Sequence, residues 1–122
     1  MTEPFLEQLA QDAAGVADRA RQTLVAVVQR GRGVGSGIIW APGVVITNAH
    51  VARTNRLSVR PGSGPPIPAK VRAHDGDLDL AVLEVEGDLG SPAVIGDSTA
   101  LRTGDWVFAV GNPWGVAGGI TG

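Results

Sequence analysis

Two residues of the types that perform acid–base chemistry stand in distinctive settings. His50 comes just after the apolar run 44–47, and Asp79 follows a polar loop and precedes the apolar run 80–85. An imidazole titrates near neutral pH, so it can take the proton from a weak nucleophile such as a serine hydroxyl. A carboxylate on its other nitrogen would fix the tautomer and stabilise the imidazolium. Residues of these two types have the chemistry that a general base, His50, and its orienting partner, Asp79, would need.

Other residues near this pair leave alternatives open. A lone histidine is more often structural or at the surface, and Asp75 or Asp77 could take the place of Asp79. His74 is predicted to be a solvated loop residue. The acids of this loop have some of the spacing of a calcium loop, but the position that needs glycine is Leu80, and an apolar run follows. No second cluster of ligands is present, so neither a metal nor a cofactor is predicted.

No serine of the chain has the setting of a nucleophile. The Gly-x-Ser-x-Gly pattern of a nucleophile elbow is absent. Ser36 precedes the histidine on an expected strand, and Ser63 lies in a proline-rich loop that cannot hold a reacting atom in place. The remaining serines are Ser58, Ser91 and Ser98, in an expected strand, loop or turn. The chain alone is therefore predicted to be inactive as a hydrolase.

A helix is expected at the start of the chain and short strands after it. Over residues 3–21 apolar side chains recur at three- and four-residue steps, which predicts an amphipathic helix. We expect it to pack on the domain as a lid, with a partner or oligomer contact as the alternative. The later part holds most of the 18 glycines and eight prolines, which favours short strands joined by turns. The expected strands are residues 24–29, 35–40, 44–47, 56–60, 68–73, 78–86 and 105–110.

The first six of these strands have no helical crossover between them, so the pattern predicts a small antiparallel barrel or sandwich of the all-β class. Three motifs narrow this prediction. Gly35-Ser-Gly37 and a hairpin lead into Thr47-Asn-Ala-His-Val51, then comes Asp79-Leu-Ala-Val-Leu-Glu-Val85, and then Gly111-Asn-Pro-Trp-Gly115. Their types and order resemble the HtrA/Deg family of trypsin-like serine proteases.

The resemblance implies a six-stranded N-terminal barrel of the chymotrypsin type. The implied divisions are an N-terminal helix at 1–23, the first barrel at 24–92, and at 93–122 a linker with the first strand of a truncated second barrel. In the family the histidine of the first motif is the general base and the aspartate that begins the second is the triad aspartate, which again gives His50 and Asp79. The family's serine lies in a Gly-Asn-Ser-Gly-Gly type of segment, which this chain lacks.

The bulk composition excludes several function classes. The net charge is −2 without a basic block, and no apolar run approaches the roughly 20 residues of a membrane span, so neither a nucleic-acid nor a membrane partner is expected. There are no cysteines to form disulfides. The N-terminus does not have the pattern of a signal peptide, which predicts a cytoplasmic location, or the cell envelope if the N-terminus is incomplete.

These observations leave three hypotheses about function. The chain is part of an HtrA-like endopeptidase acting on unfolded or peptide substrates, a non-catalytic protein-binding module on a protease half-fold, or one half of a split protease. A homo-oligomer is a possible assembly.

Overall fold

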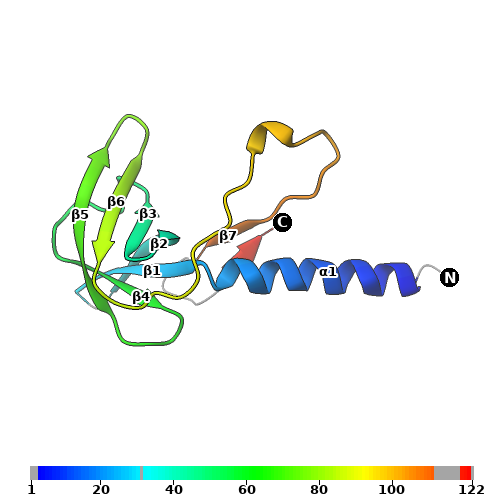
Figure 1. Ribbon diagram of the computed structural model, residues 1–122, viewed down its shortest axis with the longest axis horizontal. Helices are drawn as coiled ribbons and strands as arrows, with labels where there is room; N and C mark the ends of the chain where they lie inside the picture. Colours follow the sequence, from blue (N-terminus) through cyan, green and yellow to red (C-terminus); the bar gives the residue numbers. More distant parts are fainter. Residues whose placement is uncertain (1–2, 31, 112–118, 122) are drawn as a thin grey trace.

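Six antiparallel strands close into a barrel in the computed structural model, which describes residues 3–30, 32–111 and 119–121. Around the barrel the strands follow the order β1-β2-β3-β6-β5-β4, and β4 pairs with β1 to close it. Figure 1 shows the barrel at one end of the molecule. The barrel strands are β1 (Leu24–Gln29), β2 (Arg32–Ala41), β3 (Val44–Thr47), β4 (Leu57–Pro61), β5 (Ile67–Asp75) and β6 (Leu80–Val85). The predicted all-β barrel is confirmed.

The barrel interior is filled by alternate residues of its strands, as the twofold side-chain period of a strand requires. On β6 the inward residues are Ala81, Leu83 and Val85, each at most 4% exposed. Small residues are needed where β2 crosses this core. A Cβ added at Gly37 would lie 2.5 Å from Cγ1 of Val45, so glycine at this position lets β2 approach β3 closely. The full core is Val25, Val27, Ile39, Val45, Ala52, Leu57, Val59, Ala69, Ala81, Leu83, Val85 and Leu89.

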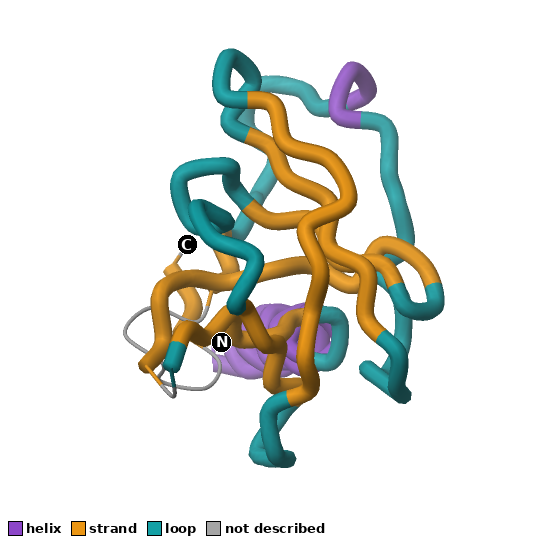
Figure 2. Tube along the Cα trace, turned by 90° about the vertical axis from the view of Figure 1, so that its left-hand side faces the viewer, coloured by secondary structure: helices purple, strands orange, loops and turns teal. Residues whose placement is uncertain are grey.

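Helix α1 (Glu3–Arg21) has the predicted bounds but does not cover the barrel. None of its residues is buried, and Phe5 near its start is 69% exposed. In Figure 1 the helix points away from the barrel, and Figure 2 shows it nearly end-on. Its apolar stripe instead borders a groove shared with Trp106 and Phe108. The expected lid is therefore wrong, because the stripe faces the segment after the barrel rather than the barrel itself.

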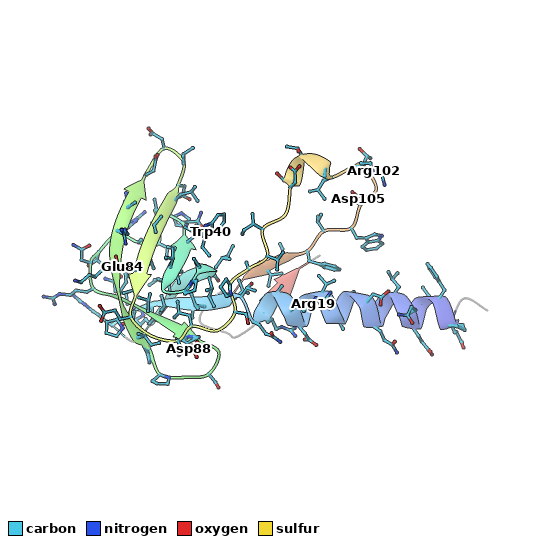
Figure 3. The ribbon with its side chains drawn as sticks, in the orientation of Figure 1. Arg19, Trp40, Glu84, Asp88, Arg102 and Asp105 are labelled. Carbon is cyan, nitrogen blue, oxygen red and sulfur yellow. The ribbon has the colours of Figure 1, made fainter. Side chains whose placement is uncertain are left out.

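The segment after β6 first crosses the barrel and then leaves it. Leu89 is 5% exposed, and the Ala93 backbone N–H donates to the Ile39 carbonyl at 2.7 Å. A loop with the short 3-10 helix η1 (Ser98–Ala100) comes next, and Figure 3 shows Arg102 and Asp105 on it, far from Trp40 and Glu84 of the barrel.

The last described residues form a small sheet of two strands, β7 (Ala109–Gly111) and β8 (Gly119–Thr121). The strand predicted at 105–110 is thus formed only from residue 109, and β8 was not predicted. Of the motif at 111–115, residues 112–115 lie outside the described residues. Among the helices that the structure describes, none is long and apolar enough to cross a membrane.

Candidate active site

The register of two barrel strands brings the two candidate residues together. Thr47, the last residue of β3, is paired with Ala81 near the start of β6. In an antiparallel pair, the residues after one strand lie beside the residues before the other. The turn after β3, which carries His50, therefore meets the residue just before β6, which is Asp79. One strand pairing thus joins two residues that are 29 positions apart in the sequence.

The turn itself is held by the core. The backbone N–H groups of Val51 and Ala52 both donate to the Asn48 carbonyl, at 3.1 and 3.2 Å, so residues 48–52 form a single tight turn. Ala49 and Ala52 anchor it, at 2% and 3% exposed. His50 between them is turned outward, with 60% of its side chain exposed. Small buried residues on either side of an exposed imidazole thus fix the backbone and leave the ring accessible.

Asp79 contacts His50 through both carboxylate oxygens. Nδ1 of His50 lies 2.7 Å from Oδ2 of Asp79, and the backbone N–H of His50 donates to Oδ1 at 2.9 Å. These two hydrogen bonds hold the pKa of Asp79 below its ordinary value of 3.8, and the one from the backbone N–H contributes most. An ionised carboxylate only accepts, so Nδ1 carries the proton and Nε2 of the neutral ring is left as an acceptor. The contact predicted for these two residues is present.

The backbone of Asp79 is held in an unusual conformation. Its φ is +53°, in the left-handed region that aspartate tolerates better than most residues with a side chain. The side-chain amide of Asn48 donates to the Asp79 carbonyl at 3.0 Å. The Thr-Asn-Ala-His motif thus contributes two side chains to the same aspartate, and Asn48 is a site residue that the sequence had not singled out for a role.

The other acids of the loop shape its backbone. Oδ1 of Asp75 accepts from the backbone N–H groups of Asp77 and Leu78, at 2.9 and 3.1 Å, which is a local turn motif. Asp75 and Asp77 are exposed. Between the three candidate carboxylates, the geometry favours Asp79 as the partner of His50.

His74 is exposed, as predicted, but it does not lie in a loop. It lies on β5, which extends to Asp75, and its Nε2 is 3.1 Å from the Ala49 carbonyl. Simple alternation from Ala69 and Val71 would have placed residue 73 in the inward row, but the pairing shifts between Val71 and Ala73 and so brings His74 opposite Ala81. No group of three or more metal-ligating side chains occurs in the part of the chain that the structure describes.

The lowered pKa of Asp79 predicts an acid dependence of stability. A group whose pKa is lowered by folding contributes stability above its ordinary value and loses it as the pH falls through the folded value. We expect the urea midpoint of the wild-type chain to fall more steeply below about pH 4 than that of Asp79→Asn, which cannot titrate. Asp97→Asn should reduce the slope as well, because its hydrogen bonds with Thr99 also lower the pKa of the Asp97 carboxyl, and it shows the size of such an effect at another aspartate. Equal slopes for wild type and Asp79→Asn would contradict the contact.

Comparison with known proteins assigns this chain to a family. Residues 35–121 match the family model described as "Trypsin-like peptidase domain", so the chain belongs to the trypsin-like peptidases. Within them it is a member of the HtrA/Deg family, as its similarity to curated relatives shows.

Two such relatives, both named "Probable periplasmic serine endoprotease DegP-like", illustrate the similarity. The chain is 39% identical over 89 residues to the one from Rickettsia conorii, a match that covers 70% of this chain and 18% of the relative. It is 34% identical over 110 residues to the one from Pseudomonas savastanoi pv. phaseolicola, with 88% and 21% covered. The chain spans about a fifth of the length of the curated relatives it matches.

Two solved structures agree in fold. The "HtrA-type protease AlgW with decapeptide" superposes with a TM-score of 0.79 at 23% identity, covering 88% of this chain and 43% of that one. The inactive form of Rv3671c from M. tuberculosis H37Rv, a serine-to-alanine mutant, gives a TM-score of 0.70 at 29% identity, with 87% and 50% covered.

Proposed function

We propose that this chain supplies the acid–base half of a serine endopeptidase, with His50 as general base and acid and Asp79 as the group that orients it. The observation that carries the proposal is the double contact of the Asp79 carboxylate, with the ring of His50 at 2.7 Å and with its backbone N–H at 2.9 Å. A generic acidic loop has no need to hold one histidine by ring and backbone at once. The match to the trypsin-like peptidase model supports the same interpretation.

The proposed chemistry depends on the tautomer. Nδ1–H of His50 donates to Asp79, so Nε2 can accept the proton of a serine hydroxyl as its oxygen attacks the peptide carbonyl. The imidazolium formed is stabilised by the carboxylate and returns its proton to the leaving amine, which leaves an acyl-enzyme. Water then attacks the acyl group with the same ring as base. None of the serines in these 122 residues lies in the Gly-Asn-Ser-Gly-Gly type of segment, so we assign the nucleophile and its oxyanion donors to a segment other than these residues.

Substrate and location are part of the proposal. The AlgW protease was solved with a decapeptide, and curated relatives are named periplasmic endoproteases. We therefore propose peptides or unfolded proteins as substrates and the cell envelope as the location. The cytoplasmic location expected from the sequence has no support among these relatives.

A fusion tests the proposal. The 122 residues alone are expected not to hydrolyse unfolded casein, whereas residues 1–122 joined to the remaining C-terminal part of the Pseudomonas savastanoi relative should do so. His50→Ala in the fusion should remove most of this activity, as loss of the base does in triad enzymes. Both fusions keep His74, so that they differ only at position 50. A folded fusion that cleaves casein equally well with His50→Ala would refute the role of His50.

A further inference from the structure

His74 and the turn that carries His50 are connected across β6. His74 on β5 is paired with Ala81 on β6, and Ala81 is paired with Thr47 on β3. Directly opposite residues of antiparallel strands share a face, so these three side chains lie in one row. The middle one is an alanine that is 1% exposed, and its short side chain leaves room for the imidazole to reach the turn after β3. In that turn, the Ala49 carbonyl lies 3.1 Å from Nε2 of His74.

The atom that His74 contacts belongs to the same peptide unit as an atom held by Asp79. The Ala49 carbonyl and the His50 N–H are the two ends of one planar trans peptide, and they point in opposite directions. His74 holds the oxygen end, and Oδ1 of Asp79 holds the N–H end at 2.9 Å. Rotation of this plane would change the direction of the Cα–Cβ bond of His50. The plane is therefore fixed from both sides, by β5 and by the residue before β6.

The hydrogen bond from His74 to the Ala49 carbonyl matters because the site is open to solvent. The side chains of His50 and Asp79 are 60% and 43% exposed, so water competes for both of their hydrogen bonds. With the carbonyl end released, this peptide unit would keep the hydrogen bond from the His50 N–H to Asp79 and lose the one to its oxygen. A carbonyl only accepts, so the contact requires that Nε2 of His74 carries a proton. The donor, rather than the charge, is the property that position 74 must supply.

We propose that His74 is a positioning residue, which orients the ring of His50 toward Asp79 by holding the Ala49–His50 peptide plane from the side opposite the carboxylate. Its consequence for catalysis rests on the proposed function, but the positioning itself can be observed in the 122-residue chain. His74 does not touch the reacting atoms in this scheme.

The test compares three side chains at position 74. Glutamine keeps an N–H donor on a chain of similar reach, whereas methionine has a similar length without the donor. The readout is the Nδ1 proton of His50, observed by NMR in the isotope-labelled chain, with its rate of exchange with solvent. His74→Gln should retain the wild-type resonance. His74→Met should broaden it or speed its exchange roughly two- to tenfold, the factor that one ordinary hydrogen bond confers. Lys70→Met, which also introduces methionine but nearer the start of β5, should leave the resonance and its exchange rate unchanged.

Each outcome has a distinct meaning. If His74→Met folds, as shown by a wild-type amide spectrum for the core, and keeps the wild-type Nδ1 resonance and exchange rate, the positioning role is overturned while the proposed function stands. If the resonance is lost equally in His74→Gln and His74→Met, the donor is not what position 74 contributes, and the proposal also fails. Should His74→Met not fold, retention of the wild-type resonance in His74→Gln supports the proposal, and its loss there overturns it. A wild-type chain with no hydrogen-bonded Nδ1 proton on His50 would instead contradict the proposed function.

Discussion

Replacing Asp79 with asparagine is expected to lower kcat of the catalytically complete fusion by about four orders of magnitude, the loss observed when the triad aspartate of a trypsin-like enzyme becomes an amide. The reason lies in the two contacts of this carboxylate. An asparagine oxygen can still accept from the backbone N–H of His50, and its NH₂ group then faces the ring nitrogen Nδ1. Facing a donor, Nδ1 becomes an acceptor, and the ring proton moves to Nε2. The ring then cannot take the proton of the serine.

The measurement is kcat and KM on a peptide substrate. KM should change little, because Asp79 is proposed to act on the base rather than on the substrate. Asp77→Asn is the matched control: it makes the same chemical change two residues away, in a residue whose backbone N–H bonds to Asp75. Similar losses from both substitutions would show that the loop as a whole, and not the carboxylate of Asp79, supports activity.

Leu83→Ala is expected to cost about 2–5 kcal/mol of unfolding free energy, the range for a large buried aliphatic residue. Leu83 is fully buried at the centre of β6, where it is paired with Val45 on β3 and Val71 on β5. The cavity would therefore lie between the strands that bring His50 and Asp79 together. Thermal unfolding of the chain should show a melting temperature lower by roughly 10 °C or more.

Leu80→Ala provides the comparison on the same strand. Leu80 is 44% exposed, so its truncation removes less burial and leaves no enclosed cavity. It also directly follows Asp79, so it controls for a change near the site. A melting temperature that falls as far in Leu80→Ala as in Leu83→Ala would contradict the assignment of the core.

Local patterns predicted most of the barrel and the two residues of the proposed catalytic pair. The alternation of apolar residues along β6 and the turn chemistry at residues 41–43 depend on near neighbours in the chain, so they are visible in the sequence. The family motifs then identified His50 and Asp79 without knowledge of the register. The role of Asn48 and the positive φ of Asp79 were not predictable, because each depends on a contact between segments about 30 residues apart.

The features that the sequence did not predict depend on long-range packing. The stripe of α1 is a local pattern, but which surface it faces is decided by the path of residues 93–108. His74 was missed because β5 continues past a bulge, where the pairing with β6 shifts between Val71 and Ala73. An inserted residue of this kind changes which side chains face inward. The position of such a bulge depends on the partner strand as much as on the bulged strand, so it cannot be read from one segment of the sequence.

The pairing of β4 with β1 completes the barrel with residues that all precede position 86. Chains are synthesised from the N-terminus at about 5–20 residues per second, and early domains can fold during synthesis. The base and its carboxylate can therefore assemble on the ribosome before later segments have emerged. Under the proposed function, the proton acceptor is then in place as soon as these residues have folded. The ring of His50 and the carboxylate of Asp79 thus meet without help from any residue after β6, because every hydrogen bond that joins them lies between residues 48 and 79.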